Sequence, residues 1–276
     1  MTLGVMWVRT IGTTSELVVA SDSRVTGGKR WDHCPKIVPL QRGDCVLSFS
    51  GETDYAYPLI LHALSTTGSW PDGANRRFPL ENLRGLLVRV LNSALSDLDH
   101  GGLRDLPPDQ TFLMLGGFSW KTQRWVIWRL EWSAERGTIR NRSVKVRSRN
   151  QIGAHTWTGD RSAVSEARER LSRLLKSRNK SLGRDGLDME PLEVLRDVVR
   201  EAGHPSVGGP LQLAKVYRHL NTRMFLVKWP DDEGNLRETL SGRFLLPAEM
   251  GTGLHSIDPD RPNVFSPEFA KDDGEA

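Results

Sequence analysis

Short runs of apolar and β-branched residues dominate the first fifty positions and predict strands. Residues 3–9 (LGVMWVR) and 16–21 (ELVVAS) flank the turn-like sequence TIGTTS and form a predicted hairpin. Two further short strands are predicted at 36–40 and 45–51, separated by the turn QRGD. The chain therefore begins with a group of strands.

After Gly51 the apolar residues recur at helical spacing. Tyr55, Leu59, Ile60 and Ala63 fall on one face of a predicted helix. Residues 79–98 form a second, strongly amphipathic pattern with proline at its start and glutamate in its first turn, as helix N-termini favour. Two helices thus follow the first strands.

The second half repeats this order. The pattern predicts strands at 111–118, 124–132 and 139–148, helices at 160–177 and 188–203, and strands at 210–217, 223–230 and 236–246. Strands and helix pairs in this alternation predict an α+β fold, a four-layer αββα sandwich of two antiparallel sheets flanked by helix pairs. We expect one domain over 1–250 and a flexible tail, rich in Gly, Pro and Asp, over 251–276.

Composition narrows the class of protein. The 276 residues are 38% hydrophobic and 26% charged, which is typical of a globular domain. The net charge of +4 favours a solubility role over nucleic-acid binding. The basic residues between 136 and 149 change strand parity between Arg142 and Lys145, so a solvated strand or a contact between protomers is favoured over a nucleic-acid surface.

Cysteine usage and the chain start predict a cytoplasmic protein. Cys34 and Cys45 are more typical of two reduced thiols than of a disulfide. No signal peptide and no apolar run of membrane-spanning length is visible, so we expect no membrane partner. Neither the cysteines nor the histidines show metal-ligand spacing, and we expect no metal and no cofactor.

Three residues at predicted strand ends carry candidate chemistry. Asp22 lies in VVASDSR, Lys36 begins a strand after CP, and Gly51 ends SFSG. Alone, each has an ordinary structural explanation; Asp22 could form a turn or an ion pair with Arg24. Their combination is what points to a function.

Together, LVVASDSRVTGG, KIVPL and CVLSFSGETDYAYPLI resemble the proteasome β-type subunits of the N-terminal-nucleophile (Ntn) hydrolases, and the chain start is similar to the bacterial two-component proteasome-like peptidase. The resemblance is specific over residues 2–66. It implies the Ntn-hydrolase fold, a threonine peptidase and assembly into rings. It also implies that Thr2 is the nucleophile, Asp22 and Lys36 its charged neighbours, Gly51 the oxyanion donor, and Thr158 with Gly159 the support of the threonine amine.

The chemistry explains why such residues would act together. An N-terminal threonine carries a hydroxyl nucleophile and its own α-amine, whose ordinary pKa of about 7.7–8.0 suits a general base. Thr13 in GTTS lies only nine residues before Asp22, in the predicted turn, and leaves room for one strand. Thr2 lies twenty residues before Asp22, enough for two strands, and directly follows Met1, which an aminopeptidase can remove.

The resemblance also extends to a substrate pocket and includes departures. It implies that an apolar specificity pocket is lined by Val25, Cys34, Val38, Phe49 and Thr53; the alternative is that these are core residues at strand periodicity. His204 and Val207 stand where the family has an aspartate and a serine. The opening TLG lacks the family's threonine run, and the first hairpin is about four residues longer.

The sequence therefore predicts a proteasome-like threonine peptidase that acts on peptides or unfolded proteins as a homo-oligomeric ring, with an ATP-dependent unfoldase as a candidate partner. Three alternatives remain: a catalytically inactive proteasome-like scaffold, an Ntn amidase acting on a small molecule, and a basic binding protein.

Overall fold

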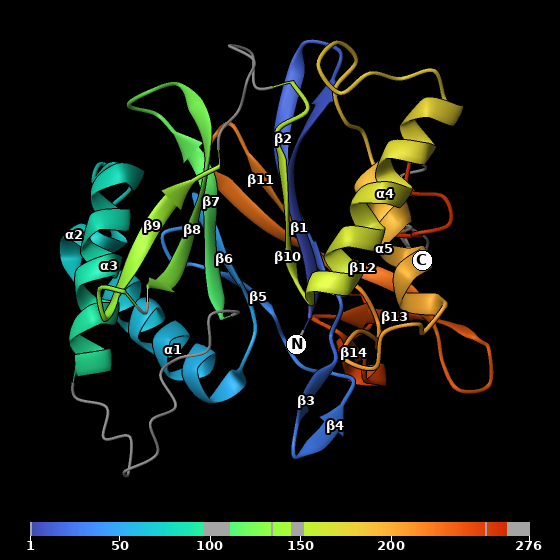
Figure 1. Ribbon diagram of the computed structural model, residues 1–276, viewed down its shortest axis with the longest axis horizontal. Coiled ribbons are helices and arrows are strands. Elements are labelled where there is room, and N and C mark those ends of the chain that lie inside the picture. Colours follow the sequence, from blue (N-terminus) through green and yellow to red (C-terminus); the bar gives the residue numbers. More distant parts are fainter. Residues whose placement is uncertain (1, 97–110, 134, 145–151, 252, 264–276) are drawn as a thin grey trace, which may run out of the picture.

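The computed structural model describes residues 2–96, 111–133, 135–144, 152–251 and 253–263. These residues form two large, mainly antiparallel sheets and five α-helices, whose arrangement is shown in Figure 1. The mixed helix and strand content and the antiparallel sheets predicted from the sequence are confirmed.

An eight-stranded sheet carries the first hairpin. Its order is β10-β1-β2-β11-β12-β13-β14, with β15 parallel to β12. Its strands are β1 (Leu3–Ile11), β2 (Thr14–Ser21), β10 (His155–Gly159), β11 (Gln212–Tyr217), β12 (Asn221–Pro230), β13 (Leu236–Leu240), β14 (Arg243–Phe244) and β15 (Ser256–Ile257). Because β1 lies between β10 and β2, the start of the chain has a neighbouring strand on each side.

A five-stranded sheet faces it, in the order β5-β6-β7-β8-β9. Its strands are β5 (Ile37–Pro39), β6 (Cys45–Ser50), β7 (Phe112–Ser119), β8 (Arg124–Ser133) and β9 (Thr138–Ser143). A separate hairpin of β3 (Val25–Gly27) and β4 (Lys29–Trp31) extends away from both sheets (Figure 1). The sequence patterns did not predict this hairpin or the short strand β10.

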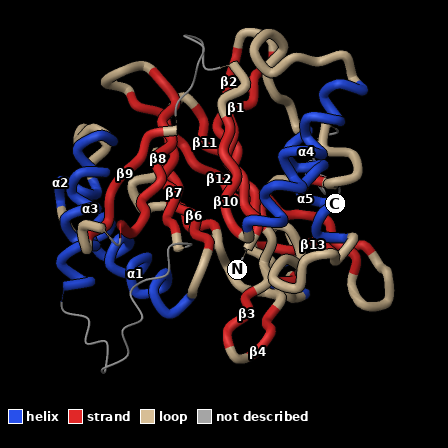
Figure 2. The backbone as a smooth tube through the Cα atoms, in the orientation of Figure 1, coloured by secondary structure: helices blue, strands red, loops and turns tan. Residues whose placement is uncertain are grey.

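The helices cover the outer faces of the two sheets (Figure 2). Helices α1 (Thr53–Ser69), α2 (Pro71–Ala74) and α3 (Leu80–Ser96) lie beside the five-stranded sheet, and α4 (Arg161–Ser177) and α5 (Glu190–Arg200) beside the other (Figure 1). A 3-10 turn spans Pro247–Glu249. Helix α3 was predictable from its apolar spacing, because its buried residues, Leu80, Leu83, Leu87 and Leu91, recur every three or four positions.

Three buried clusters hold these elements together. One joins α4 and α5 to the eight-stranded sheet through residues such as Trp7, Leu171 and Leu195. A second joins α1 and α3 to the five-stranded sheet. In the third, Met6 and Val19 of one sheet pack with Met114 of the other. Alternate residues of β1 therefore enter different clusters, as the period of a strand requires.

The segment predicted as a tail from residue 251 is described over 253–263. There β15 pairs with β12, and Ile257 is buried. Asp260 accepts hydrogen bonds from Arg200 of α5. Residues 264–276 lie outside the described part, as do 145–148 of a predicted strand. No helix among the described residues is long and apolar enough to span a membrane.

Candidate functional site

Thr2 lies immediately before β1, at the point where β10 and β2 flank that strand. Leu3 is paired with Gly159 of β10, and Gly4 with Ser21 of β2. The Thr2 carbonyl oxygen accepts a hydrogen bond of 2.8 Å from the Asp160 N–H. A Cβ on Gly159, whose φ is +126°, would overlap that carbonyl oxygen. Close backbone contact therefore fixes Thr2 on its β10 side, and only glycine fits there.

Lys36 brings a buried ammonium group to Thr2. It directly precedes β5, and its Nζ donates to the Thr2 hydroxyl, to the Arg24 carbonyl oxygen and, at 2.8 Å, to Asp22 Oδ1. The Lys36 side chain is 0% exposed. Burial lowers the pKa of Lys36, and the charge of Asp22 opposes this effect. The three donors of the ammonium thus match three oxygens, one of which is the predicted nucleophile.

Asp22 connects the chain start to the rest of the site. Besides Lys36, Oδ1 accepts from the Leu3 N–H at 3.1 Å. Oδ2 accepts from the N–H groups of Arg24 at 3.3 Å and Gly208 at 2.9 Å. Four donors thus satisfy a carboxylate that is 0% exposed. Asp22 therefore orients both Lys36 and the first residues of β1.

Gly51 and Thr158 lie on two other elements. Gly51 follows β6 with φ +113°, two residues before α1 begins, so it forms the predicted strand-to-helix turn. Thr158 is a buried residue of β10 and is paired with Gly4. Within the described residues, neither forms a hydrogen bond with Thr2. Their roles as oxyanion donor and support of the amine stay predictions.

The two departures at 204 and 207 have local structural explanations. His204 Nε2 lies 2.6 Å from Glu166 Oε2, and Val207 is buried in the cluster under α4 and α5. The Arg24 side chain forms its ion pair with Asp32, to which Nε and Nη2 donate at 2.6 and 3.0 Å. These bonds hold the pKa of Asp32 well below its ordinary range.

Sequence reasoning missed three contributors to this network. Asp32 anchors Arg24, the Gly208 N–H binds Asp22, and the Gln212 side chain accepts from the Lys36 N–H at 2.9 Å. Gly208 lies 186 residues from Asp22 along the chain and Gln212 lies 176 from Lys36, and no local pattern marks them. Asp32 lies eight residues after Arg24, and no sequence pattern marks their ion pair either.

An apolar cavity of about 320 Å³ lies beside the lysine. Cys34 and Pro35, the two residues before Lys36, line it together with Trp31, Tyr57, Ile60 and Leu61. Of the five predicted pocket residues, Cys34 is the one in this lining. Phe49 packs edge-to-face on Tyr57 with ring centroids 5.1 Å apart, and so backs one wall.

The other three predicted pocket residues lie on three different elements. Val25 is half-buried in β3, Val38 packs against the cluster under α1 and α3, and Thr53 begins α1. None of them lines this cavity. Their predicted contact with substrate stays a prediction.

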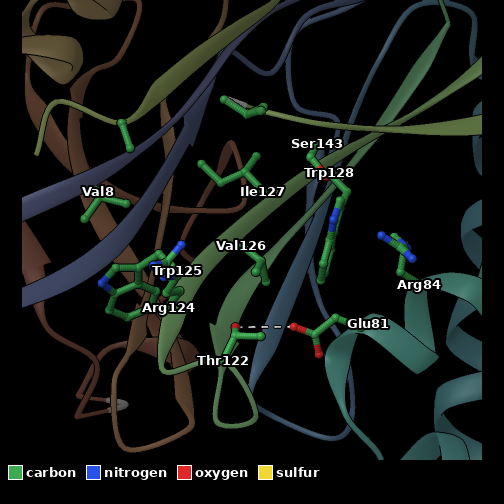
Figure 3. Close-up of a pocket in the computed structure, with 12 residues that line it drawn as sticks. Val8, Glu81, Arg84, Thr122, Arg124, Trp125, Val126, Ile127, Trp128 and Ser143 are labelled. Atoms are coloured by element: carbon green, nitrogen blue, oxygen red, sulfur yellow. Dashed lines mark hydrogen bonds between the residues drawn. The ribbon is translucent and has the colours of Figure 1, made fainter. Parts of the chain in front are cut away.

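A larger cavity lies away from the candidate nucleophile. It measures about 660 Å³, and its lining includes Val8, Glu81, Arg84 and Trp125 (Figure 3). Val8 is six residues along β1 from Thr2, about 20 Å at the rise of a strand. Thr2, Asp22 and Lys36 are absent from its lining. The volume of a cavity therefore does not indicate where Thr2, Asp22 and Lys36 lie.

Among the residues that the structure describes, no three His, Cys, Asp or Glu side chains are grouped to hold an ion. Cys34 and Cys45 are both free thiols. The chemistry that the described site offers is therefore that of a hydroxyl, a buried ammonium and a carboxylate.

Comparisons with known proteins find similarity in structure but not in sequence. No family model and no curated protein matches the chain. The Anbu complex from Pseudomonas aeruginosa, solved as a helical assembly, is 15% identical with a TM-score of 0.57 over 84% of this chain and 89% of that one. An Anbu mutant from Hyphomicrobium sp. strain MC1 is 14% identical with a TM-score of 0.52 over 81% and 87%. The chain shares the fold of these proteins.

These findings correct the family assignment made from the motifs. The motifs resemble proteasome β-type subunits, and the chain start resembles the bacterial two-component peptidase. The family assignment that this resemblance implies is wrong: no family model matches, and the similar structures reported above are Anbu proteins. The motif was short. An aspartate, a lysine and a glycine at strand ends are consistent with a fold in which strands end at those positions. They are too few to define a sequence family.

Proposed function

We propose that the protein is a threonine-type hydrolase that cleaves peptide bonds through Thr2 after Met1 is removed, within a homo-oligomer. One observation carries the proposal: the buried ammonium of Lys36 binds both the Thr2 hydroxyl and the Asp22 carboxylate. A buried lysine that contacts a hydroxyl at a chain start is an arrangement for activating that hydroxyl. The finer description of the fold as a four-layer αββα sandwich belongs to the same proposal, supported by the three clusters.

The reaction uses groups within one residue. The α-amine of Thr2 accepts the proton of its own hydroxyl as Oγ1 attacks the carbonyl carbon of the substrate. The charge of Lys36 stabilises the developing alkoxide, and Asp22 keeps Lys36 charged against the cost of burial. The proton passes to the departing amine, and water then hydrolyses the threonine ester. The Gly51 N–H is the proposed oxyanion donor and Thr158 the proposed support of the amine.

The cavities suggest how a peptide would lie. The apolar lining of Cys34, Tyr57 and Ile60 suits an apolar side chain on the amino side of the cleaved bond. The helical assembly of the Anbu complex supports oligomer formation by this chain. Unfolded protein as substrate, a cytoplasmic location and delivery by an ATP-dependent unfoldase complete the proposal.

A non-catalytic assembly subunit is the second candidate. Thr2 is buried, with 1% of its surface exposed, and this favours it. The two candidates make opposite predictions about the chemical state of Thr2.

Intact mass measurement of the purified protein tests the first step. We expect quantitative loss of Met1, because an N-terminal amine is required for the reaction; full retention of Met1 would exclude the hydrolase. A peptide boronate or epoxyketone should then label the wild type and not Thr2→Ala. Thr13→Ala is the matched control, since Thr13 is exposed in the β1–β2 turn, and it should label like the wild type.

A further inference from the structure

A third cavity, of about 420 Å³, lies on the β10 side of Thr2, and Asp22 lies on the β2 side. It is lined by Phe112 of β7, Arg129 of β8, Thr158 and Gly159 of β10, and Arg161 and Arg168 of α4, among others. It therefore connects the two sheets at the edge strand β10. Three of its lining residues are arginines, and none is Asp or Glu.

The charge of this cavity is only partly balanced. Arg129 Nε lies 2.9 Å from Glu131, and its guanidinium lies over the Phe112 ring, 3.4 Å from the centroid. Burial lowers the pKa of Arg129, and the charges of Arg142 and Arg168 act in the same direction. Arg161 and Arg168 form no ion pair with any carboxylate in the described part of the chain, and both are exposed. At least two positive charges thus face the cavity uncompensated.

Strand β10 contributes both to the lining of this cavity and to the backbone contacts of Thr2. Thr158 and Gly159 line the cavity, Gly159 is paired with Leu3, and the next residue, Asp160, donates to the Thr2 carbonyl. Asp22 follows β2 and binds the Leu3 N–H, Lys36 precedes β5 and binds the Thr2 hydroxyl, and Pro35 beside Lys36 lines the apolar cavity. Thr2 lines neither cavity, but each cavity is lined by a residue adjacent to one that contacts Thr2: Gly159 beside Asp160, and Pro35 beside Lys36.

Guanidinium groups select carboxylates by charge and by paired N–H donors. We propose that the cavity lined by Arg129, Arg161 and Arg168 binds a carboxylate of the substrate on the carboxyl side of the cleaved bond, supplied by an acidic side chain. This rests on the proposed function of Thr2 and extends it to a substrate class: peptides with an apolar residue before the bond and an acidic residue after it.

Matched internally quenched peptides test the proposal. They share an apolar residue before the bond and carry Glu, Gln or Lys at successive positions after it. We expect kcat/KM to be about tenfold higher for Glu than for Gln at one position, as for a bond to a charged group. The same peptide with an amidated C-terminus should keep this preference; if only the free-acid form is preferred, the carboxylate recognised is the chain terminus and the side-chain assignment is overturned.

Charge reversal locates the preference. Arg161→Glu combined with Arg168→Glu should remove it or shift it toward Lys, while an uncharged peptide and an active-site probe react as before. Arg173→Glu is the matched control, since Arg173 is an exposed α4 residue outside the cavity lining. A Glu-to-Gln ratio that survives the double reversal would overturn the proposal. If the double variant keeps the Glu-to-Gln ratio but sediments differently from the wild type, the proposal is also overturned, and these arginines form contacts between copies of the chain.

Binding to Thr2→Ala separates this proposal from the hydrolase itself. A fluorescent Glu-containing peptide should bind this variant about tenfold more tightly than its Gln counterpart, as expected for one bond to a charged group, and the double charge reversal should abolish the difference. If the wild type hydrolyses no peptide but this difference is present, the hydrolase fails and the cavity assignment stands. If hydrolysis occurs without any preference for Glu in either assay, the cavity assignment fails alone.

Discussion

Within the described residues two ion pairs are buried completely, and they differ in what surrounds them. Lys36–Asp22 and Arg42–Asp44 both have side chains 0% exposed, with nitrogen–oxygen distances of 2.8 and 2.6 Å. The remaining Arg42 donors reach the carbonyl oxygens of Gly73 and Phe78. The remaining Lys36 donors reach the Arg24 carbonyl and the Thr2 hydroxyl. The remaining donors of Arg42 contact only backbone, and those of Lys36 include the proposed nucleophile among their partners.

The difference shows that burial and pairing alone do not indicate catalysis. Arg42 ties the β5–β6 turn to the segment that joins α1 and α3, which is a structural role. Asp44 depends on Arg42 for two bonds, at 2.6 and 2.8 Å, with the Cys45 thiol beside it. Asp22, in contrast, keeps three backbone N–H donors that do not involve Lys36. The two pairs should therefore respond differently to the same substitution.

The largest expected contrast is between Lys36→Met and Arg42→Met. Lys36→Met should reduce peptide hydrolysis by about 10²- to 10³-fold, the scale of losing one electrostatic donor to a reacting oxygen. Arg42→Met should leave turnover by the folded protein unchanged but lower the free energy of unfolding by about 3–5 kcal/mol, because Asp44 stays buried without its partner. Hydrolysis rates and urea unfolding of both variants measure this.

The contrast fails if the two variants lose activity and stability in equal proportion. The function of Lys36 would then be structural, like that of Arg42, and the hydrolase proposal would lose its main support. The smaller stability loss expected for Lys36→Met follows from the three N–H donors left to Asp22.

A second contrast uses the glycines that contact each region. A Cβ at Gly159 would overlap the Thr2 carbonyl, and one at Gly117 would lie 2.7 Å from the Asp44 carbonyl. Gly159→Ala should lower activity about 10²-fold, since a displacement of about 1 Å at a reacting group has that effect. Gly117→Ala should cost about 1–3 kcal/mol of stability through overpacking, without changing activity per folded molecule. Equal activity in the two variants would show that the position of Thr2 is not critical.

The sequence predicted those features that depend on a single helix or strand. Helix α3 was readable from its leucine spacing, and Asp22, Lys36 and Gly51 from the ends of short strands. The hydroxyl–ammonium contact joins residues 34 positions apart, and the motif resemblance, although wrong as a family assignment, placed them correctly near each other.

What the sequence could not show depends on contacts between distant elements. Arg129, Arg161 and Arg168 come from a strand of one sheet and a helix beside the other, so no window of the sequence brings them together. The β3–β4 hairpin was missed because each strand has three residues, too few for a period to appear. The ion pair between Arg24 and Asp32 was missed for the same reason, because Asp32 comes directly after this hairpin.

A third contrast compares Asp22→Asn with Asp44→Asn. Burial lowers the pKa of Lys36 and the charge of Asp22 raises it, so replacing that carboxylate with a neutral amide should lower the pKa of Lys36 further. Hydrolysis needs the charged ammonium and falls as pH rises through the pKa of Lys36; in Asp22→Asn this decline should therefore begin at lower pH, with activity about 10- to 100-fold reduced at its maximum. Asp44→Asn should keep the wild-type pH profile. Profiles of kcat/KM from about pH 6 to 10 measure both, and superimposable profiles would contradict the assignment of Lys36.

The smallest effect concerns the thiol beside each pair. Burial raises the pKa of Cys34, and the charge of Lys36 opposes this; burial raises the pKa of Cys45 as well, and the charge of Asp44 raises it further. Cys34 also lines the apolar cavity, which gives a reagent access. Because the thiolate is the reactive form, iodoacetamide at about pH 8 should label Cys34 slowly and Cys45 only on unfolding, as read by peptide mass. Lys36→Met should slow labelling of Cys34 severalfold and leave Cys45 unchanged. Faster labelling of Cys45 than of Cys34 would contradict the difference in charge between the two pairs.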